Sequence, residues 1–394
     1  MTRILITDGD NRSALAATRA LGQLGHQVFI ASEAHPSLAS ASKYAAGFDA
    51  YKSPYVAPDR FVSDVAEILQ RRQIEVLLPM TEITTILLTR HQAALPAQVR
   101  IPFPAADVVA TAADKASVLR LAQSIGVPIP VTQIVERAED IDDFVKRVDY
   151  PAVFKPSRSR TWTGEQWVSS GAAYAANADD LRERLRKLHP AVFPVLIQER
   201  IVGPGVGVFV CCDESRVLAT FAHRRLREKP PSGGVSVLCE SAPVDPIARE
   251  HATRLLKEIG WRGVAMVEFK QDASTGTLKL MEINGRFWGS LQLAIDAGVN
   301  FPQLALDIAL SRAQPVTNYR VGVRSRWFWG DTDAMIALLL RSREQLNLPA
   351  NHPGRWRTFL NYLLPWRPGT RYELERLSDP GPALLAARRW LLRK

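Results

Sequence analysis

Residues 264–286 read VAMVEFKQDASTGTLKLMEINGR, and this stretch decides the fold. Two largely apolar segments, Val264–Lys270 and Leu278–Arg286, flank the polar residues 271–276, which are typical of a turn. The sequence therefore predicts an antiparallel hairpin. Because most side chains between the charged residues are apolar, we expect at least one face of this hairpin to be buried.

The acids of this hairpin are predicted to form a metal site. Side chains alternate along a strand, so Glu282, Asn284 and Arg286 share one face. Glu268 on the facing strand lies within about one or two residues of register with Glu282. Two buried carboxylates must share a proton or bind a cation, and an amide oxygen completes a set that suits Mg²⁺. The alternative, solvated acids on an exposed hairpin, is disfavoured by the apolar strands.

Two lysines are predicted to face an anion. Lys155 ends the apolar strand Pro151–Pro156 and precedes the polar segment Ser157–Gly171, which is predicted to be a long loop. A lysine in that place reaches a phosphate while the loop covers it. Lys115 begins the predicted helix Lys115–Ser124, where the helix dipole disfavours a cation unless an anion is bound. The alternative for each lysine, taken singly, is an ordinary solvated side chain.

With these features in place, the sequence resembles the ATP-grasp superfamily over Thr111–Arg312. Within the superfamily it looks like the carboxylate–amine ligases and the ATP-binding domains of the carbamoyl-phosphate synthase large chain and biotin carboxylase. The order and spacing of several short pieces carry the resemblance. These pieces are Asp114-Lys115, Gly126–Pro130, Val153–Pro156, Gln198–Gly203, Glu268-Phe269 and Glu282–Arg286.

The resemblance implies an α/β, Rossmann-like pre-ATP-grasp domain over residues 1–110, followed by a two-lobed α+β ATP-grasp domain over 111–312. The lobes are expected at about 111–197 and 198–312. Residues 313–394 remain as a basic, Trp-rich C-terminal region.

The first hundred residues fit this expectation, because strand-like and helix-like segments alternate there. Arg3–Thr7 and His26–Ala31 read as strands around the helical segment Ser13–Leu24, which favours a parallel sheet. The loop after the first strand lacks GxGxxG, so an oxidoreductase that uses a nicotinamide cofactor is disfavoured. A P-loop nucleotidase is disfavoured because no GxxxxGK[ST] occurs.

The resemblance also implies roles for individual residues. Lys115 and Lys155 position the nucleotide phosphates under a lid, Ser157–Gly171, and Gln198–Ile201 forms the hinge that binds adenine. Arg286 stabilises the transferring phosphoryl group, so Arg286 and Lys155 are the expected catalytic residues. The expected ligand sets are Lys115, Lys155, Gln198, Glu199 and Ile201 for ATP, and Glu268, Glu282 and Asn284 for Mg²⁺ or Mn²⁺.

Two features depart from the family pattern. The lid carries Arg158, Arg160, Trp162 and Trp167 where glycines are common in the family, so side chains are expected to clamp the phosphates. The hinge is followed by Gly203-Pro204-Gly205, and the acidic residue that sometimes binds ribose at that place is absent.

A basic cluster is a candidate site for the second substrate. Strand alternation places His223, Arg225 and Arg227 on one face, beside a glycine-containing turn. Such a cluster binds a carboxylate or a phosphate, and His223 and Arg225 are the candidates here. A solvated basic strand explains the same residues equally well.

The net charge of +10 is concentrated near the C-terminus. Residues 313–394 hold 14 Lys and Arg, 6 Asp and Glu, and five of the nine tryptophans. Interleaved basic and aromatic residues, as in Arg324–Trp329 and Arg355–Leu360, suit an anionic membrane surface. We therefore predict peripheral contact with the inner face of a membrane and consider nucleic acid an unlikely partner. The alternative is that these tryptophans pack in the core.

We expect a cytoplasmic protein. The apolar runs are far shorter than a bilayer span of roughly 20 residues, and the N-terminus lacks an apolar segment of signal-peptide length. The three cysteines, Cys211, Cys212 and Cys239, lack the spacing of a metal or redox site.

The favoured hypothesis is an ATP- and Mg²⁺-dependent ligase. By resemblance it activates a small-molecule carboxylate as an acyl-phosphate, which an amine or another nucleophile attacks, releasing ADP and phosphate. The chain is expected to form a homodimer, also by resemblance. The alternative is a catalytically silent ATP-binding sensor or scaffold on the same fold.

Overall fold

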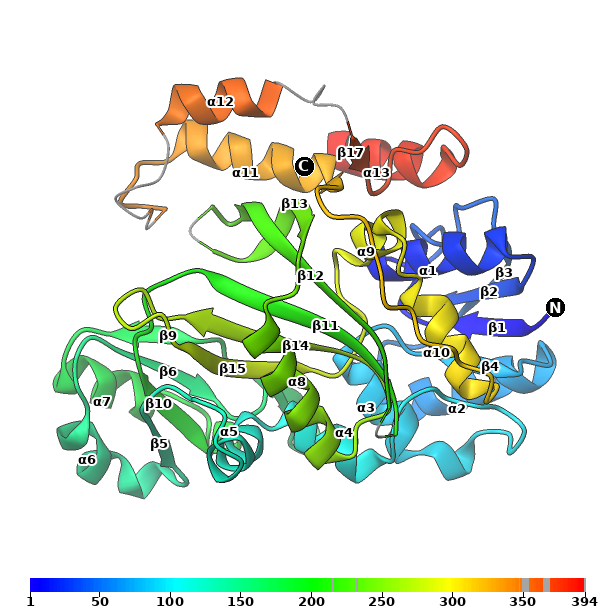
Figure 1. Cartoon of the computed structure of the whole chain (residues 1–394). Coiled ribbons are helices and arrows are strands. Elements are labelled where there is room, and N and C mark those ends of the chain that lie inside the picture. The colour runs from blue at the N-terminus through cyan, green and yellow to red at the C-terminus, as the bar shows by residue number, and fades with distance from the viewer. Residues whose placement is uncertain (215, 232, 347, 349–353, 364–368, 393–394) are drawn as a thin grey trace.

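The computed structural model describes residues 1–214, 216–231, 233–346, 348, 354–363 and 369–392. Three sheets and their helices form the body of the molecule, and a helical layer lies along its top in the view of Figure 1. One hydrophobic core runs from the N-terminal sheet into the largest sheet, whereas the lobe around β6 and β10 has a core of its own. That lobe therefore packs largely around its own hydrophobic cluster.

The N-terminal part is a parallel α/β unit, as predicted. Its sheet has the strand order β3-β2-β1-β4, and Leu5 on the central strand is paired with Phe29 and Leu77. The apolar residues of β1 are fully buried because helices cover both faces of the sheet. Its strands are β1 (Arg3–Ile6), β2 (Gln27–Ser32), β3 (Ala45–Ala50) and β4 (Val76–Leu78), and its helices are α1 (Arg12–Gln23), α2 (Pro58–Arg71), α3 (Glu82–Arg90) and α4 (Ala106–Ala113).

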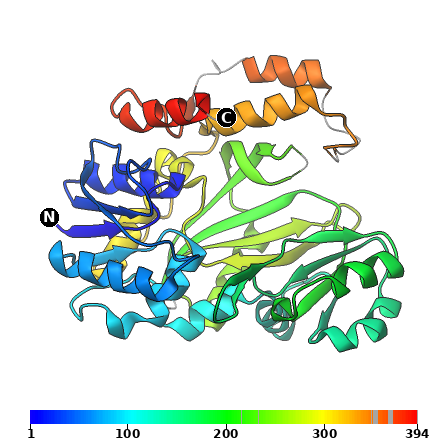
Figure 2. The same ribbon diagram turned by 180° about the vertical axis from the view of Figure 1, so that it is seen from behind.

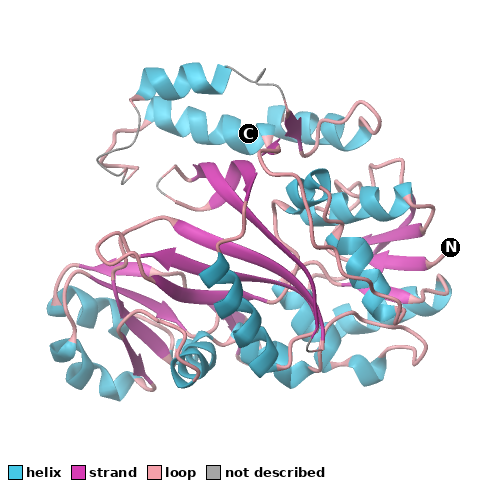
Figure 3. Cartoon of the chain, in the orientation of Figure 1, coloured by secondary structure: helices cyan, strands magenta, loops and turns pink. Residues whose placement is uncertain are grey.

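An antiparallel sheet of order β5-β10-β6-β9 forms the lobe expected at about residues 111–197. The helices α6 and α7 pack on this sheet, whereas α5 lies against the edge strand β15 (Leu278–Asn284) of the largest sheet (Figures 1 and 3). The strands are β5 (Thr132–Val135), β6 (Ala152–Pro156), β9 (Ala173–Ala175) and β10 (Val195–Glu199), and the helices are α5 (Lys115–Ser124), α6 (Ile141–Phe144) and α7 (Ala178–Arg186).

The lid differs from the predicted long loop. Within Ser157–Gly171, the strands β7 (Arg160–Trp162) and β8 (Trp167–Ser169) form a short antiparallel hairpin. Trp162 lies directly across from Trp167, and their ring centroids are 5.3 Å apart. An aromatic cross-strand pair of this kind stabilises a hairpin, although the polar composition of the segment indicated a loop.

The second lobe is built on a seven-stranded sheet of order β15-β14-β11-β12-β13-β16-β17. The hairpin predicted from residues 264–286 supplies the two strands at one edge. The strands are β11 (Gly205–Asp213), β12 (Arg216–Lys229), β13 (Val235–Ala242), β14 (Gly263–Gln271), β15 (Leu278–Asn284), β16 (Arg324–Arg326) and β17 (Thr370–Tyr372), and the helices are α8 (Pro246–Ile259), α9 (Leu291–Ala297) and α10 (Phe301–Ala309).

The C-terminal region is joined to the body and is not a free basic tail. Its strands β16 and β17 extend the large sheet, and α11 (Phe328–Leu340), α12 (Arg355–Leu363) and α13 (Gly381–Leu391) form the top layer seen from both sides in Figures 1 and 2. Trp329 and Trp390 pack against each other, Trp356 is 79% exposed, and Trp366 lies outside the described residues. Several of its described arginines are in ion pairs with acids, which are Glu240, Asp296, Asp331 and Asp10.

The deepest of these attachments joins α1 to the C-terminal segment. Arg19 Nε donates to Asp379 Oδ2 at 2.7 Å, and both side chains are at most 5% exposed. The same guanidinium donates to the backbone carbonyls of Glu373 and Leu374, and Asp379 also accepts from the Ser42 hydroxyl. This network fixes the end of the chain on the N-terminal unit.

We predict that Asp379→Ala lowers the free energy of unfolding by about 3–5 kcal/mol, because it leaves the Arg19 charge buried without its partner. Urea unfolding measures this change. As a control, Glu183→Ala removes an exposed pair with Lys187 and should have little effect. An Asp379→Ala protein as stable as the wild type would show that the network contributes nothing.

Candidate functional site

Two carboxylates face each other on the edge hairpin. Glu268 on β14 is directly paired with Glu282 on β15, and a register irregularity follows between Glu268 and Phe269. Their side chains are 23% and 31% exposed, so both are largely removed from water. Side chains directly across a strand pair lie close, so two negative charges meet at this point.

Cations and an amide surround the carboxylate pair. Arg225 NH2 donates to Glu268 at 2.9 Å, and Lys115 Nζ lies 3.5 Å from Glu282. Asn284 Nδ2 donates to the other oxygen of Glu282 at 2.9 Å. Each carboxylate therefore has its own cation, and the residues come from the helix α5, the strand β12 and the hairpin itself.

The surroundings shift the pKa values of the two carboxyl groups in opposite directions. Burial raises the pKa of Glu268, an effect that the nearby Glu282 charge reinforces and Arg225 only partly offsets. Burial also acts to raise the pKa of Glu282, but Lys115, Asn284, Lys155 and Arg286 outweigh it, so that this pKa is lowered. Glu282 is thus the more strongly ionised member of the pair.

Lys155 lies across the cleft from the hairpin. It is 8% exposed, and its Nζ donates to the backbone carbonyl of Met281 at 3.2 Å. Burial lowers its pKa to about 8, although the Glu282 charge acts in the opposite direction. Lys155 therefore links the sheet of the first lobe to the strand that carries Glu282.

Asp114 holds the start of α5, and Lys115 with it. Its carboxylate caps the helix by accepting from Ser117 N at 3.1 Å, and it also accepts from Ser157 Oγ at 2.6 Å and Arg158 Nε at 3.0 Å. Lys115 Nζ in turn donates to Ser159 Oγ at 3.2 Å. Sequence reasoning missed Ser157 and Ser159 as positioning residues, because no local pattern marks a serine that bonds across 40 residues.

The hinge residues take up different positions. The amide of Gln198 donates to Thr132 Oγ1 at 2.8 Å, while its Oε1 is buried without a partner among the described residues. Leu196 is paired with Lys155, so Gln198, two residues on, faces the same side as Lys155. Gln198 thus presents an unsatisfied acceptor toward the cleft.

Glu199 is held by protein groups. Its Oε1 accepts from Val131 N at 2.8 Å and from Lys279 Nζ at 2.5 Å. The carbonyl of Ile201 accepts from Lys270 Nζ at 3.2 Å. Sequence reasoning did not single out Lys279 or Lys270, because neither lies in a motif.

Arg286 retains donors for a ligand. It donates to the Phe287 carbonyl at 2.9 Å and to Asn284 Oδ1 at 3.3 Å. Among the described residues, no carboxylate forms an ion pair with Arg286. Arg225 and Lys115, in contrast, each have such a partner.

The basic cluster of β12 is divided among separate partners. Arg225 binds Glu268 and Glu228, whereas register irregularities around Arg227 turn its guanidinium toward Asp331. His223 stacks on a phenylalanine ring, and Ser290 Oγ lies 3.0 Å from its Nε2. Burial, aided by the Arg225 charge, lowers the pKa of His223 to about 3, so it is a neutral side chain near pH 7.

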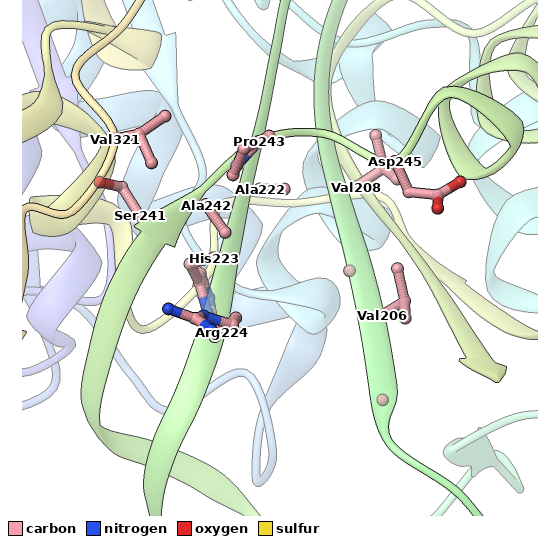
Figure 4. Close-up of a pocket in the computed structure, with 12 residues that line it drawn as sticks. Val206, Val208, Ala222, His223, Arg224, Ser241, Ala242, Pro243, Asp245 and Val321 are labelled. Atoms are coloured by element: carbon pink, nitrogen blue, oxygen red, sulfur yellow. The ribbon is translucent and has the colours of Figure 1, made fainter. Parts of the chain in front are cut away.

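A cavity of about 410 Å³ opens on the large sheet (Figure 4). Gly207 is paired with Glu268, so the neighbouring Val206 and Val208 face the opposite side of the sheet. Both valines line the cavity, together with Gly205, Gly207 and His223 of the strands β11 and β12.

The donor set fits a hard divalent cation. Over the described ranges, no three His, Cys, Asp or Glu side chains come together as a metal site. Glu268, Glu282 and Asn284 nevertheless bring two carboxylates and one amide together, and Mg²⁺ prefers oxygen ligands of this kind.

Comparisons with known proteins agree with this geometry. Residues 192–329 match the family described as "ATP-grasp in the biosynthetic pathway with Ter operon". A D-alanine–D-alanine ligase of Thermoanaerobacter sp. is 25% identical over 202 residues, which cover 47% of this chain and 54% of the relative. Over these segments the chain is similar to ATP-grasp proteins.

Solved structures show the same fold. An L-amino acid ligase from Bacillus licheniformis superposes with a TM-score of 0.60 at 17% identity, covering 80% of this chain and 75% of the ligase. The biotin carboxylase domain of the Hydrogenobacter thermophilus 2-oxoglutarate carboxylase, a dimer with MgADP, ADP and bicarbonate, gives a TM-score of 0.62 at 18% identity over 82% and 73% of the two chains. The chain spans about half the length of the curated relative that it matches.

We predict that nucleotide affinity falls as the pH rises through about 8. Below this value Lys155 already carries its proton, whereas above it the free protein must take up a proton when an anionic phosphate binds. Calorimetric titration with ADP from pH 6.5 to 9.5 measures the break, which Lys155→Arg should remove. Constant wild-type affinity over this range would contradict the assignment.

Proposed function

We propose that this protein is an ATP- and Mg²⁺-dependent ligase that activates a small-molecule carboxylate for attack by an amine or another nucleophile. The observation that carries the proposal is the buried pair Glu268 and Glu282 with Lys115 and Lys155 beside it. Two acids and two lysines in one cleft suit a divalent cation and a polyphosphate together.

The proposal gives the nucleotide a defined orientation. Its phosphates lie between Lys115 and Lys155, under the lid, and its adenine lies at Gln198–Ile201. The unpartnered Oε1 of Gln198 supports this orientation, because it can accept a hydrogen bond from the exocyclic amine of adenine. Guanine carries an oxygen at that position, which would leave both acceptors unpaired.

Glu268, Glu282 and Asn284 would hold Mg²⁺, or Mn²⁺ in its place. The cation supplies charge neutralisation for the phosphates when it is bound. The MgADP in the related carboxylase domain supports this assignment. Lys115, whose Nζ lies 3.5 Å from Glu282, would be available to a phosphate once the cation is bound.

The proposed reaction has two steps. A substrate carboxylate oxygen bonds to the γ-phosphorus while the bond from that phosphorus to the β,γ-bridging oxygen breaks, which releases ADP. An amine nitrogen then attacks the acyl carbon, and phosphate leaves as the amine loses a proton. Arg286, with its uncommitted donors, would stabilise the transferring group, and Lys155 would hold the phosphates in line.

This proposal assigns a role to each part of the chain. Residues 1–110 would contribute to substrate binding, and residues 111–312 would bind ATP between the lobes 111–197 and 198–312. Residues 313–394 would pack against the other two parts and stabilise them. We also propose a cytoplasmic homodimer, supported by the dimer of the related carboxylase domain.

We predict that Glu282→Ala lowers ATP turnover by about 100-fold or more, because one ligand of the cation is lost and Lys115 has no counter-charge. ADP release over a panel of carboxylates and amines measures turnover. Glu183→Ala, a surface change, serves as the control. Wild-type turnover in Glu282→Ala would contradict the mechanism, and Mg²⁺-dependent ATP binding without ADP release from any substrate would favour the silent sensor.

Membrane contact is a second proposal and rests on the top layer. Within the described residues, no helix is both long and apolar enough to cross a bilayer. On α12, however, Trp356, Leu360 and Leu363 are all more than half exposed, and their spacing places them on one side of the helix. Arg355 and Arg357 are also exposed there, and α12 contains no acid. Such a face suits anionic lipid.

We predict that vesicles containing phosphatidylglycerol sediment with the wild-type protein and that Trp356→Ser weakens this binding several-fold. Leu24→Ser changes an exposed side chain of the N-terminal unit and should bind like the wild type. Equal binding to neutral phosphatidylcholine vesicles would refute the role of charge.

A further inference from the structure

The lid hairpin β7–β8 depends on contacts outside its own strands. It forms a two-stranded sheet by itself, and an isolated pair of this length is marginal in water. The indole of Trp167 packs against the large core that contains the N-terminal sheet. The hairpin therefore takes its position from residues elsewhere in the chain.

One hydrogen bond joins the lid to the N-terminal unit. Trp167 Nε1 donates to the backbone carbonyl of Pro54 at 3.0 Å, across 113 residues of sequence. An indole N–H that is partly buried requires an acceptor, and this carbonyl is the one that it has.

An arginine and a tyrosine form a second contact beside it. Arg160 NH1 donates to the hydroxyl of Tyr55 at 3.3 Å, and its guanidinium carbon lies 4.8 Å from the centroid of the tyrosine ring. The guanidinium thus meets both the oxygen and the face of Tyr55. One contact comes from each strand of the hairpin. Together they restrain both the orientation of the hairpin and its distance from the N-terminal unit.

The receiving loop is itself fixed to the end of β1. Val56 N and Ala57 N both donate to the carbonyl of Ser53, which shapes a tight turn around Tyr55. Tyr51, at the start of the loop, is hydrogen-bonded to Asp8, which is the second residue after the end of β1. The loop therefore offers the lid a rigid partner.

The base of the lid touches the residues assigned to the phosphates. Arg158 forms an ion pair with Asp114 at 3.0 Å, and Ser159 accepts from Lys115 Nζ. The next residue along the chain is Arg160, which contacts Tyr55. One short segment thus connects the start of α5 with the N-terminal unit.

We propose that Pro54 and Tyr55 form a latch that holds the lid hairpin closed over the phosphate site, with Tyr55 as a positioning residue for the lid. This inference deepens the proposed function, on which its catalytic meaning rests. Closing the latch shields the phosphates from water, and opening it lets ADP leave. Because the latch lies in the N-terminal unit, that unit controls access to the nucleotide without touching it.

Hydrogen exchange of the apo protein tests the latch without any substrate. In Tyr55→Ala the amides of residues 160–169 should exchange about two- to fivefold faster, because one cation–π contact and one hydrogen bond are lost. Tyr55→Phe keeps the ring and should have a smaller effect. The matched control is Tyr44→Ala, which removes a similar contact with Lys43 elsewhere in the N-terminal unit and should leave these amides unchanged.

Two results would overturn the latch. One is unchanged exchange of the lid amides in Tyr55→Ala. The other is faster exchange that spreads through β1 and β4, since Tyr55 would then be a general stabilising residue.

A second measurement connects the latch to the nucleotide. The dissociation rate of a fluorescent N-methylanthraniloyl-ADP should rise about two- to fivefold in Tyr55→Ala and in Trp167→Phe, and not in Tyr44→Ala. Unchanged dissociation rates in both latch variants would contradict control of nucleotide release. If the wild type binds no nucleotide, the proposed function fails, whereas the exchange measurement still decides the latch.

Discussion

The opposition of Glu268 and Glu282 is the constraint on which the site depends. Two carboxylates placed side by side in a protected cleft repel each other, and the fold must supply positive charge from elsewhere. It does so with Arg225 from β12 and Lys115 from α5. The second lobe and the first lobe are thus drawn to one point, and Lys155 reaches the same strand from β6. Each carboxylate of the pair is balanced by a cation of its own, and in the proposed function a metal and a nucleotide would bind among these groups.

Much of this site was predictable because it depends on local alternation. The pattern in residues 264–286 gave the hairpin and the meeting of Glu268 with Glu282, which pairing within one hairpin determines. The strand before Lys155 and the helix after Asp114 were equally local. His223 shows the limit, since its neutrality follows from burial against Phe209, which no periodicity reveals.

The remaining differences come from contacts between distant residues. The lid reads as a loop from its composition, and its hairpin is completed by Trp167 meeting Pro54. The C-terminal arginines read as a solvated basic tail, yet acids far away in sequence neutralise several of them, as Asp296 does for Arg376. Such pairings add no local periodicity, so a single sequence carries no signal for them. The fold class could be predicted from the sequence, whereas the contacts between distant segments could be seen only in the structure.

The attachment of Arg19 to Asp379 has a consequence for biosynthesis. These partners are 360 residues apart, so the guanidinium leaves the ribosome long before its counter-ion exists. Until the segment around Asp379 is made, α1 carries a cation without its buried partner, and the edge formed by β13 lacks β16 and β17. The nascent N-terminal unit must therefore remain incomplete until that segment has been translated. A ribosome-stalled nascent chain that stops short of Asp379 would hold this unit in its incomplete form.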